Sequence, residues 1–149
     1  MPSFGKRSER LLEDLHPLLV KLLRECIHHI DFSLLETHRT PERQQTLVDT
    51  GRSMTKNSKH LQLPSEAFDF CPYPMSKKDW KYPDRFIGVA KFIMATCKQM
   101  QRDGRIPATF NLRWGGDWDS DDLYGRAHRS EQTFDDLGHI EMVFNAERR

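Results

Sequence analysis

The chain has 149 residues, of which 23 are basic and 22 acidic, so its formal net charge is +1 at pH 7. So small a charge creates no overall field toward a polyanion, and we expect no nucleic-acid partner. The apolar fraction of 37% is enough for one hydrophobic core, and the length suits a single domain over residues 1–149. The three cysteines are unevenly spaced and indicate neither a disulfide framework nor a cysteine metal site.

The N-terminal region carries leucines at helical spacing from Leu11 to Leu23, which predicts a buried helix with Ser8 as its N-cap. Pro17 either kinks this helix or begins a second one. Four ionisable side chains interrupt the same apolar stretch: Glu13, Asp14, His16 and Lys21. We therefore expect neither a signal peptide nor a membrane span, and we expect synthesis in the cytoplasm.

A strand and a helix are predicted before a long polar loop. Residues 31–37 form the strand. Thr40 and Pro41 then start the helix, because a capping hydroxyl is followed by proline at the first helical position. This helix is expected to end near Gly51, and a polar loop follows over residues 51–65.

The second half of the chain contains three predicted strands and one long helix. The strand at residues 67–71 is followed by a helix over 84–104 and a strand over 109–114. An acidic loop, 117–136, leads to a last strand, 138–144, in which polar and apolar side chains alternate. Helices and strands do not alternate regularly, so we expect an α+β fold with a small antiparallel sheet and flanking helices.

Two of the histidines, His60 and His139, lie beside or on predicted strands. A catalytic zinc site needs three histidine or carboxylate ligands, an open position for water, and a carboxylate near that water. His60, Asp69 and His139 could be the ligands, and Asp136 the general base. On spacing alone, solvated polar residues are the stronger interpretation, because seven histidines and 22 acidic residues offer many such triples.

Several short segments, in the same order along the chain, resemble the LAS metallopeptidases, and the phage L-alanyl-D-glutamate endopeptidases in particular. The LAS group also contains the D-alanyl-D-alanine carboxypeptidases and dipeptidases of the VanY and VanX type. The matching segments are Phe4–Ser8, Arg39–Gln44, Ser58–His60, Ala67–Phe70, Trp114–Trp118 and Asp136–Glu141. One interval departs from the pattern, since His60 and Asp69 are nine residues apart where the family usually has seven.

The resemblance implies a role for each of these candidates. His60, Asp69 and His139 would bind one zinc ion, with water in the fourth position. Asp136 would act as general base, and Arg39 would stabilise the oxyanion, although a salt bridge at the start of a helix is the alternative for Arg39. Two further residues would contact the substrate or orient a ligand: Ser58 and Glu141.

The resemblance also implies a fold like that of hedgehog and D,D-peptidases, and a single catalytic domain without a separate cell-wall-binding domain. Its activity would be hydrolysis of the L-Ala–D-Glu bond in peptidoglycan stem peptides, as the monomeric endolysin of a phage. The protein would leave the host cytoplasm through a holin-type pore and act on the cell wall from the periplasm. Two alternatives stay open: a D-Ala-D-Ala carboxypeptidase of the same fold, and a zinc-stabilised wall-binding module without catalysis.

The acidic loop after the predicted third strand offers a second candidate cation site. Its carboxylates could bind calcium through oxygen: Asp117, Asp119, Asp121 and Asp122. An EF-hand register would also require a turn glycine and a closing glutamate, and both are absent. A solvated acidic loop is therefore the alternative interpretation.

Overall fold

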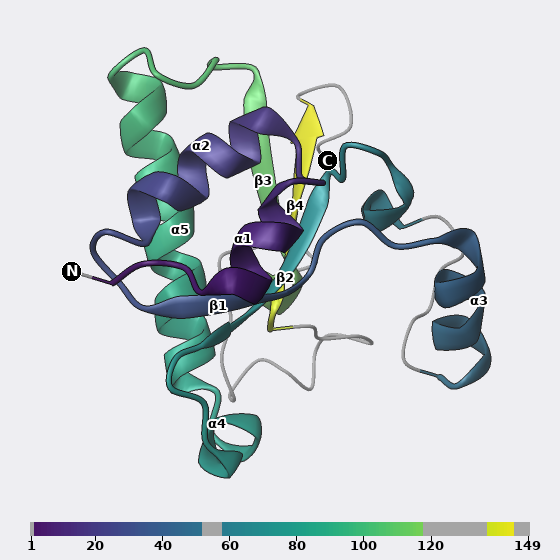
Figure 1. Cartoon of the computed structure of the whole chain (residues 1–149). Coiled ribbons are helices and arrows are strands. Elements are labelled where there is room, and N and C mark those ends of the chain that lie inside the picture. Colours follow the sequence, from purple (N-terminus) through teal and green to yellow (C-terminus); the bar gives the residue numbers. More distant parts are fainter. Residues whose placement is uncertain (1, 52–57, 118–136, 145–149) are drawn as a thin grey trace.

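A four-stranded antiparallel sheet, in the order β1–β2–β4–β3, forms the centre of the protein (Figure 1). The computed structural model describes residues 2–51, 58–117 and 137–144. The strands are β1 (Phe32–Glu36), β2 (Ala67–Pro72), β3 (Phe110–Trp114) and β4 (His139–Phe144). The predicted α+β class with a small antiparallel sheet is confirmed.

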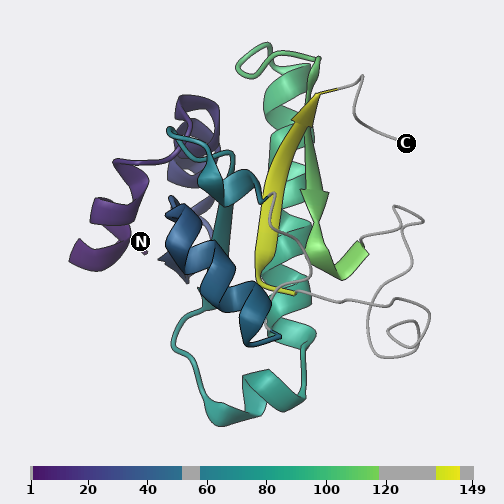
Figure 2. The same cartoon turned by 90° about the vertical axis from the view of Figure 1, so that its right-hand side faces the viewer.

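Helices cover the sheet unequally on its two sides. The long helix α5 runs along one side, and α3 stands on the opposite side, as the two views in Figures 1 and 2 show. The α-helices are α1 (Lys6–Leu12), α2 (Pro17–Cys26), α3 (Pro41–Asp49), α4 (Lys77–Lys81) and α5 (Asp84–Arg102), and two short 3-10 turns are η1 (Lys59–Leu61) and η2 (Gly115–Asp117). Within the described ranges every helix is too short or too polar to cross a bilayer.

The hydrophobic core lies between the α5 side of the sheet and the helices α2 and α5. Alternate residues of each strand point to one face of a sheet. The strand residues at alternate positions in this core are Phe32, Leu34, Phe68, Phe70, Phe110, Leu112, Trp114, Ile140 and Met142. The positions between them, including Asp69, His139 and Glu141, therefore point to the other face of the sheet.

The helix ends show which local signals decide the structure. Thr40 caps α3 as predicted, since its hydroxyl accepts a hydrogen bond from the Arg43 amide at 3.1 Å. Pro17 begins a second helix, and the His16 ring accepts the Leu18 amide at its N-terminus. Gly104, with φ of 76°, follows the end of α5 in the left-handed conformation that favours glycine.

Two local features differ from the sequence interpretation. Ser8 is not an N-cap, because α1 already begins at Lys6 and the buried Ser8 hydroxyl accepts the Leu34 amide of β1 at 3.0 Å. The short helix α4 was not predicted. It is only five residues long and depends on a capping box between Ser76 and Asp79 rather than on an apolar face.

Candidate metal centre

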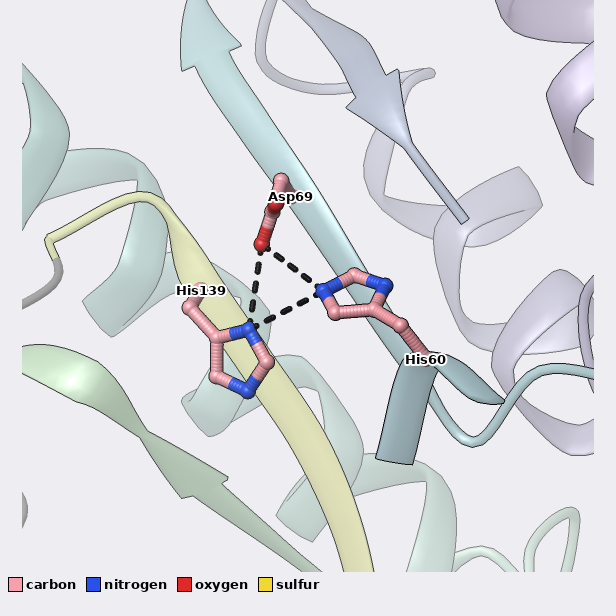
Figure 3. Close-up of side chains that lie close together, drawn as sticks. All are labelled: His60, Asp69 and His139. Carbon is pink, nitrogen blue, oxygen red and sulfur yellow. Dashed lines mark hydrogen bonds and ion pairs between the residues drawn. The ribbon is translucent and has the colours of Figure 1, made fainter. Parts of the chain in front are cut away.

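The sheet register and one 3-10 turn bring three distant side chains together. Asp69 of β2 pairs directly with His139 of β4, so both side chains project from the same face of the sheet. His60 lies in η1, and its ring points toward the other two (Figure 3). His60 and His139 are 1% and 7% exposed, and Asp69 is partly buried.

The three facing atoms form a nearly equilateral triangle. His60 Nε2 lies 3.1 Å from Asp69 Oδ1 and 3.2 Å from His139 Nδ1, and His139 Nδ1 lies 3.0 Å from Asp69 Oδ1. Tetrahedral zinc with bonds of about 2.0 Å would place its ligand atoms about 3.3 Å apart. The triangle therefore has the size of one face of a zinc coordination tetrahedron, and these residues could hold a metal ion.

The outer nitrogens of both imidazoles are already engaged by acceptors. His60 Nδ1 donates to the Thr37 carbonyl oxygen at 2.5 Å, and His139 Nε2 donates to the Glu141 carboxylate at 2.9 Å. Each neutral ring then directs a lone pair at the Asp69 carboxylate oxygen. Because three lone pairs at these distances repel one another, the centre requires a proton or a metal cation between them. The donor set of two imidazoles and one carboxylate suits zinc.

The Asp69 carboxyl is held in its ionised form. Burial alone would raise its pKa, but with a proton on the inner ring nitrogens, hydrogen bonds and charge from His139 and His60 outweigh burial and hold the pKa well below its ordinary value. Asp69 is therefore a carboxylate at neutral pH, the form that binds metal ions.

A buried guanidinium lies beside the triangle. Arg39 is 8% exposed, and its Nη2 donates to Asp69 Oδ2 at 3.2 Å and to Glu36 Oε1 at 2.7 Å. Its Nη1 donates to Gln44 Oε1 at 2.7 Å. Among the described residues, Arg39 Nε finds no hydrogen-bond partner. Arg39 thus contacts the candidate ligand Asp69 directly. It also bonds to the Glu36 carboxylate at the end of β1 and to the Gln44 amide in α3.

The loop between His60 and Asp69 is anchored to the connection between α1 and α2. Ser58 caps η1, since its hydroxyl accepts the His60 amide at 3.1 Å, so it orders the turn that carries this candidate ligand. The buried Ser65 donates to the Ala67 carbonyl oxygen, and its backbone bonds to Asp14 and His16. Leu63, between these anchors, is 66% exposed. The interval from His60 to Asp69, which is two residues longer than usual in the family, therefore contains an exposed turn.

The segment before His139 is held by close backbone contacts. The Trp114 indole donates to the Leu137 carbonyl oxygen at 2.9 Å. A Cβ atom at Gly116 would overlap the Trp114 ring, and one at Gly138 would lie 2.7 Å from the Phe70 carbonyl oxygen. The two glycines permit these approaches, and the Trp114 bond links the Trp-Gly-Gly run to the segment before His139.

Sequence reasoning did not identify Glu36 or the Thr37 carbonyl as parts of the site. The Thr37 carbonyl carries no sequence signal, because any residue can supply a backbone oxygen. Glu36 could have been suspected only from its position three residues before Arg39, the spacing of their ion pair.

The candidate base Asp136 lies outside the described residues, as do Asp119, Asp121 and Asp122. Asp117 ends η2, but its side chain also lies outside the described part. The calcium site therefore stays a prediction.

Comparison with known proteins identifies the family of the chain. Residues 2–143 match the family described as phage L-alanyl-D-glutamate peptidase. A protein of Escherichia phage T5 named L-alanyl-D-glutamate peptidase is 31% identical over 144 residues, which cover 94% of this chain and 97% of that protein. The fold is similar to the crystal structure of Serratia marcescens L-Ala D-Glu endopeptidase ChiX, with a TM-score of 0.69, 24% identity, and coverage of 97% of this chain and 93% of that one. The chain belongs to the phage L-alanyl-D-glutamate peptidase family, and the prediction of a peptidase is confirmed.

Proposed function

We propose that this protein is a zinc-dependent peptidoglycan endopeptidase that hydrolyses the L-Ala–D-Glu bond of stem peptides. The observation that carries the proposal is the convergence of His60, Asp69 and His139 on a triangle with edges of 3.0–3.2 Å. Membership of the phage L-alanyl-D-glutamate peptidase family supports the proposal that the L-Ala–D-Glu bond is the one cleaved. Two imidazoles and a carboxylate leave one tetrahedral position for water, as in other catalytic zinc sites.

The three ligands and Asp136 would have different roles in peptide hydrolysis. Zinc, when bound by the three ligands, would act as a Lewis acid and bring the pKa of its bound water near neutrality. Asp136 would accept a proton from the attacking water and pass it to the leaving amine of D-Glu. Its position three residues before His139 supports this role, because the intervening Leu137 and Gly138 are anchored to Trp114 and Phe70.

Arg39 would stabilise the negative charge that develops on the scissile carbonyl oxygen. Its guanidinium is buried beside Asp69, and its Nε–H has no partner among the described residues. A cation that is already fixed in place needs no reorganisation as charge develops on the substrate. Its bonds to Glu36 and Gln44 hold the group in one orientation.

We further propose that the 149 residues act as one monomeric catalytic domain in phage lysis. The family match over residues 2–143 supports this role. After synthesis in the host cytoplasm, the protein would pass a holin-type pore and reach the cell wall in the periplasm.

Digestion of purified sacculi tests the proposed activity. The protein is incubated with peptidoglycan alone, with a chelator, and with the chelator followed by zinc, and the new termini are identified by mass spectrometry. We expect new amino groups on D-Glu that disappear with chelator and return with zinc. His60→Ala should abolish them, whereas His28→Ala, an exposed histidine on the turn after α2, should not.

Other products would reject the proposed bond or the proposed catalysis. Release of D-Ala would identify a carboxypeptidase with the same metal centre. Failure to cleave any wall preparation after zinc loading would favour a binding module without catalysis.

A further inference from the structure

A β-bulge at the end of β1 places a second carboxylate beside the candidate ligands. Leu34 pairs with Phe70, but the next pair along β2 joins Asp69 to Glu36 rather than to Leu35. Leu35 is thus the extra residue of the bulge, and the bulge shifts Glu36 into the position across from Asp69. The end of the strand therefore places an acidic residue across from Asp69, where regular pairing would have placed Leu35.

Glu36 and Asp69 share one guanidinium. Arg39 Nη2 donates to Glu36 Oε1 at 2.7 Å and to Asp69 Oδ2 at 3.2 Å, so the shorter bond is the one to Glu36. The Arg39 and Glu36 side chains are 8% and 21% exposed, so solvent screens their interaction only in part. Arg43 also approaches Glu36, at 3.4 Å, but it is 49% exposed and interacts weakly for that reason.

The charges of these groups bear on metal binding. Arg39 alone would weaken the site, because a cation bonded to the Asp69 carboxylate opposes the binding of a second cation to the same group. Glu36 offsets this charge, so Glu36, Arg39 and Asp69 together carry a net charge of −1. Without Glu36 the three positions would sum to zero, and the attraction for a divalent ion would fall.

We propose that Glu36 is a positioning residue of the metal centre, which holds Arg39 and offsets its positive charge, so that Arg39 does not cancel the attraction of Asp69 for the metal. This inference rests on the proposed function, since it assumes that the triangle binds zinc. The proposal also assigns a role to the β-bulge, which brings Glu36 to Arg39. With regular pairing, Asp69 would be the nearest carboxylate partner of Arg39. Glu36 acts through Arg39 and need not touch the substrate.

Zinc affinity, measured by competition with a chromophoric chelator, tests the proposal without reference to catalysis. Glu36→Gln should raise the Kd for zinc about tenfold. Glu36→Asp keeps the charge and should stay within about threefold of the wild type. The double variant Glu36→Gln/Arg39→Met restores the net charge of −1 and should recover most of the lost affinity. Glu13→Gln, an exposed residue at the end of α1, makes the same overall charge change and should have no effect.

Two results would overturn the role of Glu36. One is an unchanged zinc affinity in Glu36→Gln while the wild type binds zinc. The other is a double variant that binds zinc no better than Glu36→Gln, since a structural defect would not be relieved by removing Arg39. Thermal unfolding of each variant shows that it is folded, and Glu36→Asp provides the comparison if Glu36→Gln unfolds. A wild type that binds no zinc would instead reject the metal centre itself.

Discussion

Replacement of Gly138 by alanine tests how closely the backbone positions His139. The Phe70 amide donates to the Gly138 carbonyl oxygen at 2.8 Å, so β2 and β4 are bonded immediately beside a candidate ligand. An alanine Cβ would lie 2.7 Å from the Phe70 carbonyl oxygen and 3.4 Å from the Phe86 ring. The first distance is about 0.7 Å shorter than ordinary van der Waals contact, and backbone atoms must move to relieve it.

The expected cost follows from that overlap. Overpacking of this kind destabilises a protein by about 1–3 kcal/mol. A displacement of about 0.7 Å would also exceed the tolerance of a metal site, which is about 0.5 Å, so we expect the Kd for zinc to rise about tenfold. Urea unfolding of the metal-free protein gives the first quantity, and chelator competition gives the second.

Gly88 provides a matched control for this substitution. It lies in α5, and a Cβ atom there would meet nothing within 4 Å. Gly88→Ala should therefore leave zinc binding unchanged and stabilise the helix by about 0.5–1 kcal/mol. The reasoning is refuted if Gly138→Ala matches the wild type in both measurements, or if Gly88→Ala is equally damaging.

Three further predictions concern ionisable groups. Glu141→Ala removes the acceptor that orients His139 and should raise the Kd for zinc about 10–100-fold, by chelator competition; an unchanged Kd would contradict this. The folded-state pKa of Asp69 is lowered, so its contribution to metal-free stability is present above about pH 4 and is lost as pH falls further. Urea unfolding at pH 3–6 should show this loss in the wild type, and a loss of equal size in Asp69→Asn would exclude Asp69 as its source. Burial raises the thiol pKa of Cys26 to about 12 and of Cys97 to about 11; a thiol reagent at pH 8 should label them only after denaturation, and rapid labelling of the folded protein would refute their burial.

The parts of this structure that depend on local patterns could be predicted from the sequence. Thr40 and Pro41 start α3 because capping needs only neighbouring backbone groups. Alternation along β4 places His139 and Glu141 on one face because the side-chain period of a strand is two.

The parts that depend on distant partners could not be predicted from local patterns. Ser8 looked like a cap, but its hydroxyl bonds to β1, a partner that only the tertiary fold supplies. The bulge that brings Glu36 to Asp69 arises from strand pairing and leaves no local signal. The ligand set was ambiguous on spacing alone, and it was the order of the segments resembling a known family that singled out these three residues.

X-ray absorption spectroscopy at the zinc edge of the zinc-loaded protein identifies the atoms that bind the metal. We expect two imidazole nitrogens and oxygen ligands at about 2.0–2.2 Å, with no sulfur neighbour. His139→Ala should reduce the imidazole contribution to one ring. Sulfur coordination, or a spectrum unchanged by His139→Ala, would show that zinc binds elsewhere and would contradict the metal centre formed by His60, Asp69 and His139.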